Sequence, residues 1–253
     1  MPDLIPVSTS APLPAPAIVA LREDVPTIEQ LFLYAREAEL RVSTLRMTIE
    51  ERSWSARGED VAWHEVLMQH PRRARVTSRR SEDPLSREYT VWIGDGDTIR
   101  TYDAAHRLAS IRSRRPGVVG SGRADLPPFA RTREVQTELP SGSIADAFVH
   151  PHGLFRNVLV TGPLAILGTA EVAGREAIIL RTDHPRATEV LTDRPDRWLE
   201  VGIDRASGFV VLLVEHVDRH VTRRAIVTLL EPDARIPEHA FALHLGSDVR
   251  MIY

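Results

Sequence analysis

Short segments in which every second residue is apolar, separated by turn-forming residues about every ten positions, most constrain the fold of this chain. Residues 44–50 show this period-two pattern, which is typical of a half-buried strand. Residues 198–203 repeat it, and residues 204–208 (DRASG) supply a tight reversal before residues 209–214 return as the next strand. A series of such segments predicts an antiparallel meander.

Two segments have helical rather than strand patterns. Thr27 and Gln30 have the spacing of a capping box, and the apolar residues that follow recur at helical period. Ser143 is placed to cap a short helix over residues 144–149. We therefore predict an α+β fold, in which a single large, curved antiparallel sheet forms a half-open β-barrel and helices cap it.

The ends and the middle of the chain differ from this pattern. Residues 1–26 are rich in proline and alanine and predict a disordered N-terminal arm. Residues 27–253 then form one domain, and residues 112–142 form a long irregular loop within it. Loops of that length usually act as lids, bind partners or are disordered.

Composition excludes several kinds of chemistry. The chain has no cysteine and no lysine, which excludes disulfides, thiolate nucleophiles, Schiff-base lysines and the P-loop lysine. A net charge of −3 gives no electrostatic reason to expect nucleic acid as a partner. No segment is apolar enough to span a membrane, and the N-terminal residues lack the pattern of an export signal, so we expect a cytoplasmic protein.

Several segments together resemble a known family. They are, in chain order, HPRRARV (70–76), VWIGDGDTIRTYD (91–103), GREAIIL (174–180), WLEVGIDRASGFVV (198–211) and IPEHAF (236–241). The residues of these segments and their order in the chain resemble those of the LolA/LolB-like lipoprotein-carrier superfamily and of the RseB/MucB-like domains of sigma-E regulators. The resemblance covers about residues 27–245.

Members of this superfamily are half-open barrels whose concave face holds acyl chains or an apolar peptide segment. The resemblance thus implies a non-enzymatic carrier or sensor that binds an apolar small molecule, a lipid or a lipidated partner and needs no cofactor. Apolar residues of the predicted strands are the expected wall of the site: Leu45, Met47, Ile49, Trp63, Leu67, Tyr89, Val91, Ile93, Val211 and Leu213. The structural alternative is that they form an ordinary closed core under the first helix.

Two other functions stay open. The same concave face, or the loop after Arg112, would bind a protein partner in a regulatory interaction module. A hydrolase-type enzyme would instead need His150, His152 or His184 to meet an acid inside the cavity. An open apolar cavity favours the lipid, whereas a cavity filled by its own side chains favours the protein partner.

The polar clusters carry weaker signals. The pairs His150/His152 and His216/His220 have spacings seen in metal sites, but neither has a third fixed ligand, and we predict no metal. Arg73, Arg75 and Arg79 alternate along one strand, and we expect them on a solvated outer face.

Overall fold

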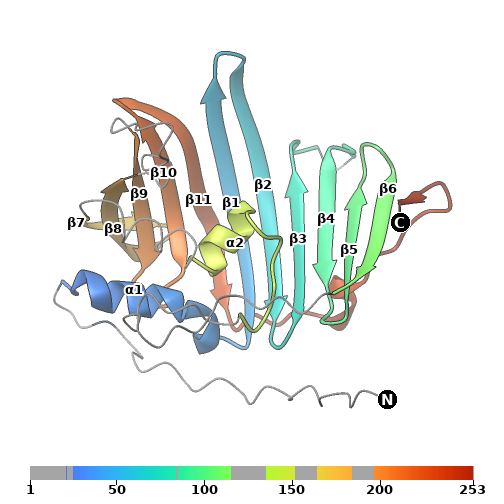
Figure 1. Ribbon diagram of the computed structural model, residues 1–253, viewed down its shortest axis with the longest axis horizontal. Helices are drawn as coiled ribbons and strands as arrows, with labels where there is room; N and C mark the ends of the chain where they lie inside the picture. The colour runs from blue at the N-terminus through green and yellow to red at the C-terminus, as the bar shows by residue number, and fades with distance from the viewer. Residues whose placement is uncertain are drawn as a thin grey trace, which may run out of the picture.

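Twelve strands form one open, curved sheet in the computed structural model, which describes residues 21, 25–83, 85–114, 135–151, 164–183 and 197–252 (Figure 1). The helical elements in this part of the chain are α1 (Ile28–Arg36), η1 (Ala38–Arg41), α2 (Ile144–Val149) and η4 (Glu238–Phe241). The strands are β1 (Thr44–Ser55), β2 (Gly58–Gln69), β3 (Arg73–Arg79), β4 (Tyr89–Gly94), β5 (Thr98–Asp103), β6 (Leu108–Ser113), β7 (Ala165–Val172), β8 (Arg175–Asp183), β9 (Arg197–Asp204), β10 (Val210–Val217), β11 (His220–Pro232) and β12 (Arg250–Ile252). The predicted half-open antiparallel sheet with few helices is confirmed.

The sheet consists of two meanders that meet at its centre. The strand order is β12-β6-β5-β4-β3-β2-β1-β11-β10-β9-β8-β7, so the first meander is β1–β6 and the second is β7–β11. β1 joins them by pairing with β11, and β12 adds in parallel beside β6. The chain end marked C in Figure 1 therefore lies near β6.

Both predicted helices begin at the predicted caps. The Thr27 hydroxyl accepts a hydrogen bond from the Gln30 amide at 3.2 Å, and the Gln30 side chain accepts one from the Thr27 amide at 2.9 Å. Ser143 caps α2 in the same way through the amide of Asp146. Local sequence is sufficient to start a helix when the cap satisfies the free amides of the first turn.

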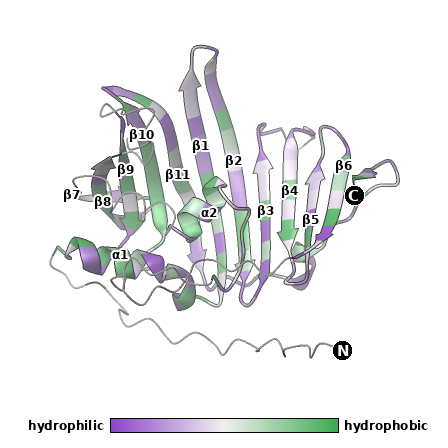
Figure 2. Cartoon of the chain, in the orientation of Figure 1, coloured by the Kyte–Doolittle hydropathy of each residue, from purple (hydrophilic) through white to green (hydrophobic). Residues whose placement is uncertain are grey.

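The two helices cover one face of the sheet, which we call the inner face, and it is the concave face. α2 contacts β2 and β10, so it lies across β1 and β11. Figure 2 shows hydrophobic residues along α2 and β8–β10, whereas β3 and β5 are mostly hydrophilic. The buried core joins α1, α2, β1, β2 and β8–β11, and it includes Leu31, Phe148, Met47, Leu180, Val201 and Val227. The inner face over β3–β6 is left outside most of this core.

Tyr34 anchors α1 to the turn between β9 and β10. Its side chain is buried, and its hydroxyl donates to the carbonyl of Ala206 at 2.7 Å and lies 3.0 Å from that of Arg205. Gly208 in that turn has φ +84°, and a Cβ there would lie 2.8 Å from the Tyr34 carbonyl oxygen. The turn needs glycine because both the positive φ and the close contact exclude a side chain.

Replacing Tyr34 with phenylalanine should lower the free energy of unfolding by about 1 kcal/mol, since the carbonyls of Arg205 and Ala206 lose a partly buried donor. Urea unfolding measures this difference. Tyr89→Phe is the matched control, because the Tyr89 hydroxyl makes no hydrogen bond with the described residues. Equal losses in the two variants would contradict the anchoring role of Tyr34.

The C-terminal segment crosses the outer face of β3. Arg75 donates through Nη1 to the carbonyls of Ala240 at 2.9 Å and Ala242 at 3.3 Å. The Arg73 guanidinium lies 5.7 Å from the centre of the buried Phe241 ring and 3.3 Å from Glu238. The predicted arginine stripe does lie on one outer face, but two of its members hold this segment in place.

The predicted division into an arm and one domain stays a prediction. Most of residues 1–26 and most of the loop over residues 112–142 lie outside the described residues.

Candidate functional site

A hollow of about 610 Å³ lies on the inner face over β3–β6. We call it the apolar compartment. Its lining comprises Val76, Ser78, Thr90, Val91, Trp92, Thr101, Tyr102, Asp103, Leu108, Ala109, Ser110, Pro140, Ser143 and Ile252. The strand β12 and the segment before α2 therefore wall the two sides of a hollow whose floor is the sheet.

Trp92 is the largest apolar side chain of this compartment. Its side chain folds back over Gly94, two residues along the same face of β4, and a Cβ at Gly94 would lie 2.8 Å from the indole ring. Trp92 also packs against the edge of the core. The absence of a side chain at Gly94 is therefore what lets the indole lie flat against the sheet and leaves the compartment open.

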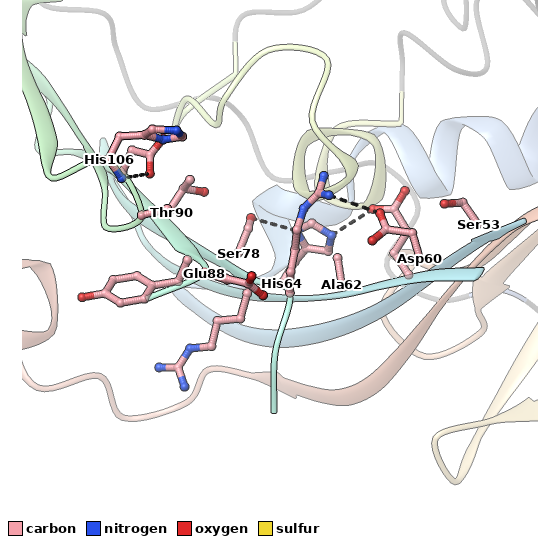
Figure 3. A pocket seen from close by; sticks show the side chains of 14 residues that line it. Ser53, Asp60, Ala62, His64, Ser78, Glu88, Thr90 and His106 are labelled. Carbon is pink, nitrogen blue, oxygen red and sulfur yellow. Dashed lines mark hydrogen bonds and ion pairs between the residues drawn. The ribbon is translucent and has the colours of Figure 1, made fainter. Parts of the chain in front are cut away.

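A second hollow of about 630 Å³ adjoins the first and is polar (Figure 3). We call it the polar compartment. It is lined by Glu51, Ser53, Asp60, Ala62, His64, Ser78, Arg79, Arg80, Glu88, Tyr89, Thr90, Asp103, Ala105 and His106. Ser78, Thr90 and Asp103 line both compartments, so the two form one continuous surface.

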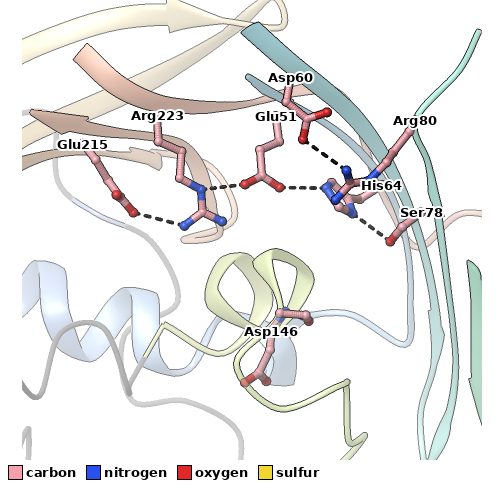
Figure 4. Close-up of polar contacts among 9 residues, drawn as sticks. Glu51, Asp60, His64, Ser78, Arg80, Asp146, Glu215 and Arg223 are labelled. Carbon is pink, nitrogen blue, oxygen red and sulfur yellow. Dashed lines mark hydrogen bonds and ion pairs between the residues drawn. The ribbon is translucent and has the colours of Figure 1, made fainter. Parts of the chain in front are cut away.

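A row of hydrogen bonds crosses five strands of the inner face beside the polar compartment (Figure 4). We call it the polar ladder: Glu215 on β10, Arg223 on β11, Glu51 on β1, His64 on β2 and Ser78 on β3. The successive distances are 3.0 Å, 2.6 Å, 2.9 Å and 2.8 Å. The ladder is possible because the pairing register places these side chains on the same face of neighbouring strands.

Glu51 is the central acid of the ladder. Burial raises the pKa of its carboxyl, but the hydrogen bonds and charges of His64 and Arg223 outweigh burial and hold the pKa at about 2. Glu51 is therefore ionised at neutral pH and can only accept hydrogen bonds. It fixes a hydrogen on His64 Nε2 and leaves Nδ1 facing the Ser78 hydroxyl.

Ser78, His64 and Glu51 are joined in the order of the serine–histidine–acid triads of hydrolases. Ser78, however, lies inside β3 between two paired strands, so its amide is committed to the sheet. In such hydrolases the amide of the nucleophilic serine helps to stabilise the oxyanion. The arrangement is therefore better suited to binding than to acyl transfer.

His150 is buried away from both hollows. Its Nδ1 lies 2.9 Å from Asp146, its Nε2 lies 3.2 Å from the buried Glu39, and only 2% of its side chain is exposed. Burial lowers the pKa of the His150 imidazole, but the hydrogen bonds and charges of Asp146 and Glu39 outweigh burial and raise the pKa to about 9. This histidine thus fastens α2 to η1 as a buried cation between two acids.

The ten predicted wall residues do not share one surface. Five are buried in the core with the helices: Leu45, Met47, Ile49, Val211 and Leu213. The pairing register places the other five on the outer face: Trp63, Leu67, Tyr89, Val91 and Ile93. Of the ten, only Tyr89 and Val91 border the two hollows. Contact of any of the ten with a ligand stays a prediction.

The sequence reading missed the residues that line the open half. Trp92 alternates with the predicted wall residues Val91 and Ile93 on β4, so an error of one position in the face exchanges the two sets, and no residue of β6 was among the predicted ones. The sequence signal that would have found them is the polar character of the same face: His64, Ser78 and Thr90 occupy positions that a closed core would fill with apolar residues.

The other predicted chemical residues do not assemble. His152 and His184 lie outside the described residues. His216 stacks on Trp198 with ring centres 3.5 Å apart, and His220 is exposed at the start of β11. Within the described ranges, no group of three or more histidine, aspartate or glutamate residues is placed to hold a metal ion.

Comparison with known proteins adds structural neighbours only. No family model matches the sequence, and none of the curated proteins does. MucB in the Pseudomonas aeruginosa MucA/MucB complex is similar over 85% of this chain and 60% of its own, with 14% identity and a TM-score of 0.49. The lipoprotein LppX of Mycobacterium tuberculosis is similar over 85% and 100%, with 10% identity and a TM-score of 0.41. A LolA superfamily protein of Nitrosomonas europaea is similar over 87% and 99%, with 8% identity and a TM-score of 0.34.

At 8–14% identity, this likeness concerns the fold alone. This chain spans about 60% of the length of MucB. The prediction of a cytoplasmic location is wrong by this comparison, because the neighbours include a named lipoprotein and MucB bound to MucA(peri), which point away from the cytoplasm. That prediction rests on the pattern of the N-terminal residues and on the lack of a long apolar segment. Among the described helices, none has the length and apolar content that a membrane span requires.

Proposed function

We propose that the protein binds the apolar chain of a lipid, of an acyl group or of a lipidated partner in the apolar compartment, as a carrier or sensor and without chemical change. The observation that supports this most directly is the open hollow beside Trp92 and Leu108 in a sheet whose other half is filled by helices. Its volume of about 610 Å³ falls within the range of about 300–1,000 Å³ that is typical of small-molecule sites.

Leu108→Asp tests this proposal, because it places a carboxylate against the bound chain. Burial of an unpaired charge is costly, so the affinity for an acyl probe should fall at least about tenfold. The probe is a fluorescent acyl lipid titrated into protein that has been stripped of lipid, and native mass spectrometry identifies any lipid that co-purifies.

Ile111→Asp is the matched control, since Ile111 is on the same strand but on the outer face and is 50% exposed. It should bind the probe as the wild type does. A wild-type protein that takes up no lipid would overturn the proposal and favour a protein partner. An equal loss of affinity for the probe in Leu108→Asp and Ile111→Asp would show that the ligand does not bind in the apolar compartment.

The same mass spectra test for turnover at Ser78. An ester lipid recovered intact after prolonged incubation supports binding without chemistry, whereas release of free acid that Ser78→Ala abolishes would identify a hydrolase.

A further inference from the structure

We propose that the polar compartment receives an uncharged headgroup rich in hydroxyls, such as glycerol or a sugar. The ligand class is then a neutral hydroxylated amphiphile whose chain lies in the apolar compartment. This inference rests on the proposed function and specifies the polar end of the same ligand.

The boundary between the compartments is built from hydroxyl groups. Ser78 and Thr90 are direct register neighbours on β3 and β4, and both line both compartments. A molecule that fills both hollows therefore passes over these two side chains. This is where the chain of an amphiphile joins its headgroup.

The two hydroxyls have hydrogen-bonding capacity to offer. Because His64 Nε2 donates to Glu51, a neutral His64 ring accepts at Nδ1 from the Ser78 hydroxyl, and the Ser78 oxygen keeps its own acceptor sites. The exposed Thr90 hydroxyl makes no side-chain hydrogen bond with the described residues. Together they can donate to and accept from the hydroxyl of a ligand.

Two arginines neutralise part of the negative charge of the polar compartment. Glu51 is paired with Arg223, Asp60 lies 3.5 Å from Arg80, and Asp103 accepts a hydrogen bond from His106 at 2.8 Å. The remaining carboxylate of the lining, Glu88, is exposed at the rim, where water screens it.

This arrangement disfavours a charged headgroup of either sign. An anionic headgroup would meet four carboxylates, while Arg79 lies on the outer face through its register with Trp63 and Tyr89. A cationic headgroup would have to displace Arg223 or Arg80 to pair with Glu51 or Asp60. Desolvating a charge without a new partner is costly, whereas hydroxyls can be satisfied by Ser78 and Thr90.

The test compares three ligands of the same chain length: a monoacylglycerol, the fatty acid and the alkylamine. Isothermal titration of the full-length, lipid-stripped protein should show the monoacylglycerol binding about tenfold more tightly than either charged ligand, which corresponds to ~1.4 kcal/mol. A fatty acid or an amine that binds as tightly as the monoacylglycerol, or more tightly, would overturn the inference.

Thr90→Val and Ser78→Ala remove the hydroxyls with little change of shape. Combined, they should weaken monoacylglycerol binding about tenfold and leave fatty-acid binding unchanged. Thr48→Val, on the outer face of β1, is the matched control and should alter neither. Equal weakening of both ligands by the double variant would contradict a headgroup role for these hydroxyls.

The two proposals fail in different ways. If none of the three ligands binds the wild type, the proposed function itself is overturned. If all three bind equally and Leu108→Asp abolishes binding, the apolar site stands and only the headgroup assignment is overturned.

Discussion

Replacing His150 with alanine is expected to lower the free energy of unfolding by about 3–5 kcal/mol, the cost of breaking a buried ion pair from one side. The substitution leaves the Glu39 carboxylate, with 4% of its side chain exposed, without its cation. It also removes the side chain that joins α2 to η1. Urea unfolding at neutral pH measures the loss, and His220→Ala, which removes an exposed histidine, should change stability by less than about 0.5 kcal/mol.

The pH dependence of the same site provides an independent check. The pKa of His150 is raised from 6.5 to about 9 in the folded protein. Its stabilisation, up to ~3 kcal/mol, is therefore fully present below the unfolded pKa and is lost as the pH rises through the folded pKa. The wild type should lose stability between pH 6.5 and about 9 more steeply than His150→Ala does. Parallel pH profiles for the two proteins would contradict the ion pair.

Replacing Glu51 with alanine should cost about 3 kcal/mol, because the polar ladder loses the acid that holds both Arg223 and His64. The side chain of Glu51 is 19% exposed, so solvent offsets little of this loss. Glu65→Ala is the matched control on the outer face, where the pair with Arg46 is long and about half exposed, and it should cost ~0–1 kcal/mol.

The pH dependence of Glu51 has the opposite sign to that of His150. Its pKa is lowered from 4.5 to about 2 on folding. Its stabilisation, at most ~3 kcal/mol, is present above the unfolded pKa and is lost as the pH falls through the folded pKa. Glu51→Gln keeps the shape of the side chain without the charge, so its stability should fall less between pH 4.5 and 2 than that of the wild type. An unchanged acid profile would show that another carboxyl dominates.

The parts of the fold that local sequence determines were predictable. The capping box at Thr27 and the cap at Ser143 define the starts of α1 and α2, because their partners lie three residues away. The strands follow from a period of two and from turn residues. The order of the five segments that resemble the LolA/LolB-like superfamily predicts the half-open sheet. Local patterns alone do not distinguish such a sheet from a closed barrel.

The faces of the strands could not be predicted in the same way. On β4 the more apolar set, which includes Val91 and Ile93, was assumed to face inward, yet it lies on the outer face next to the strand that the C-terminal segment crosses. An apolar face indicates burial without indicating what covers it. The phase of each strand depends on the length and bulges of its turns, which long-range packing fixes.

The polar ladder is equally hidden in the sequence. Arg223 and Glu51 are 172 positions apart and meet only because β11 pairs with β1. Nothing in the neighbourhood of either residue identifies the other as its partner.

The pairing of β1 with β11 also affects the order in which the protein can be built. The ribosome releases β1–β6 long before β11 is synthesised. During that time the edge of β1 that will pair with β11 has no partner strand. β1 carries apolar residues such as Leu45, Met47 and Ile49. An unpaired strand with such residues tends to associate with other chains. The pairing at the centre of the finished sheet therefore forms late in synthesis, when only η4 and β12 remain to be made, and the nascent chain depends most on protection from aggregation just before β11 emerges.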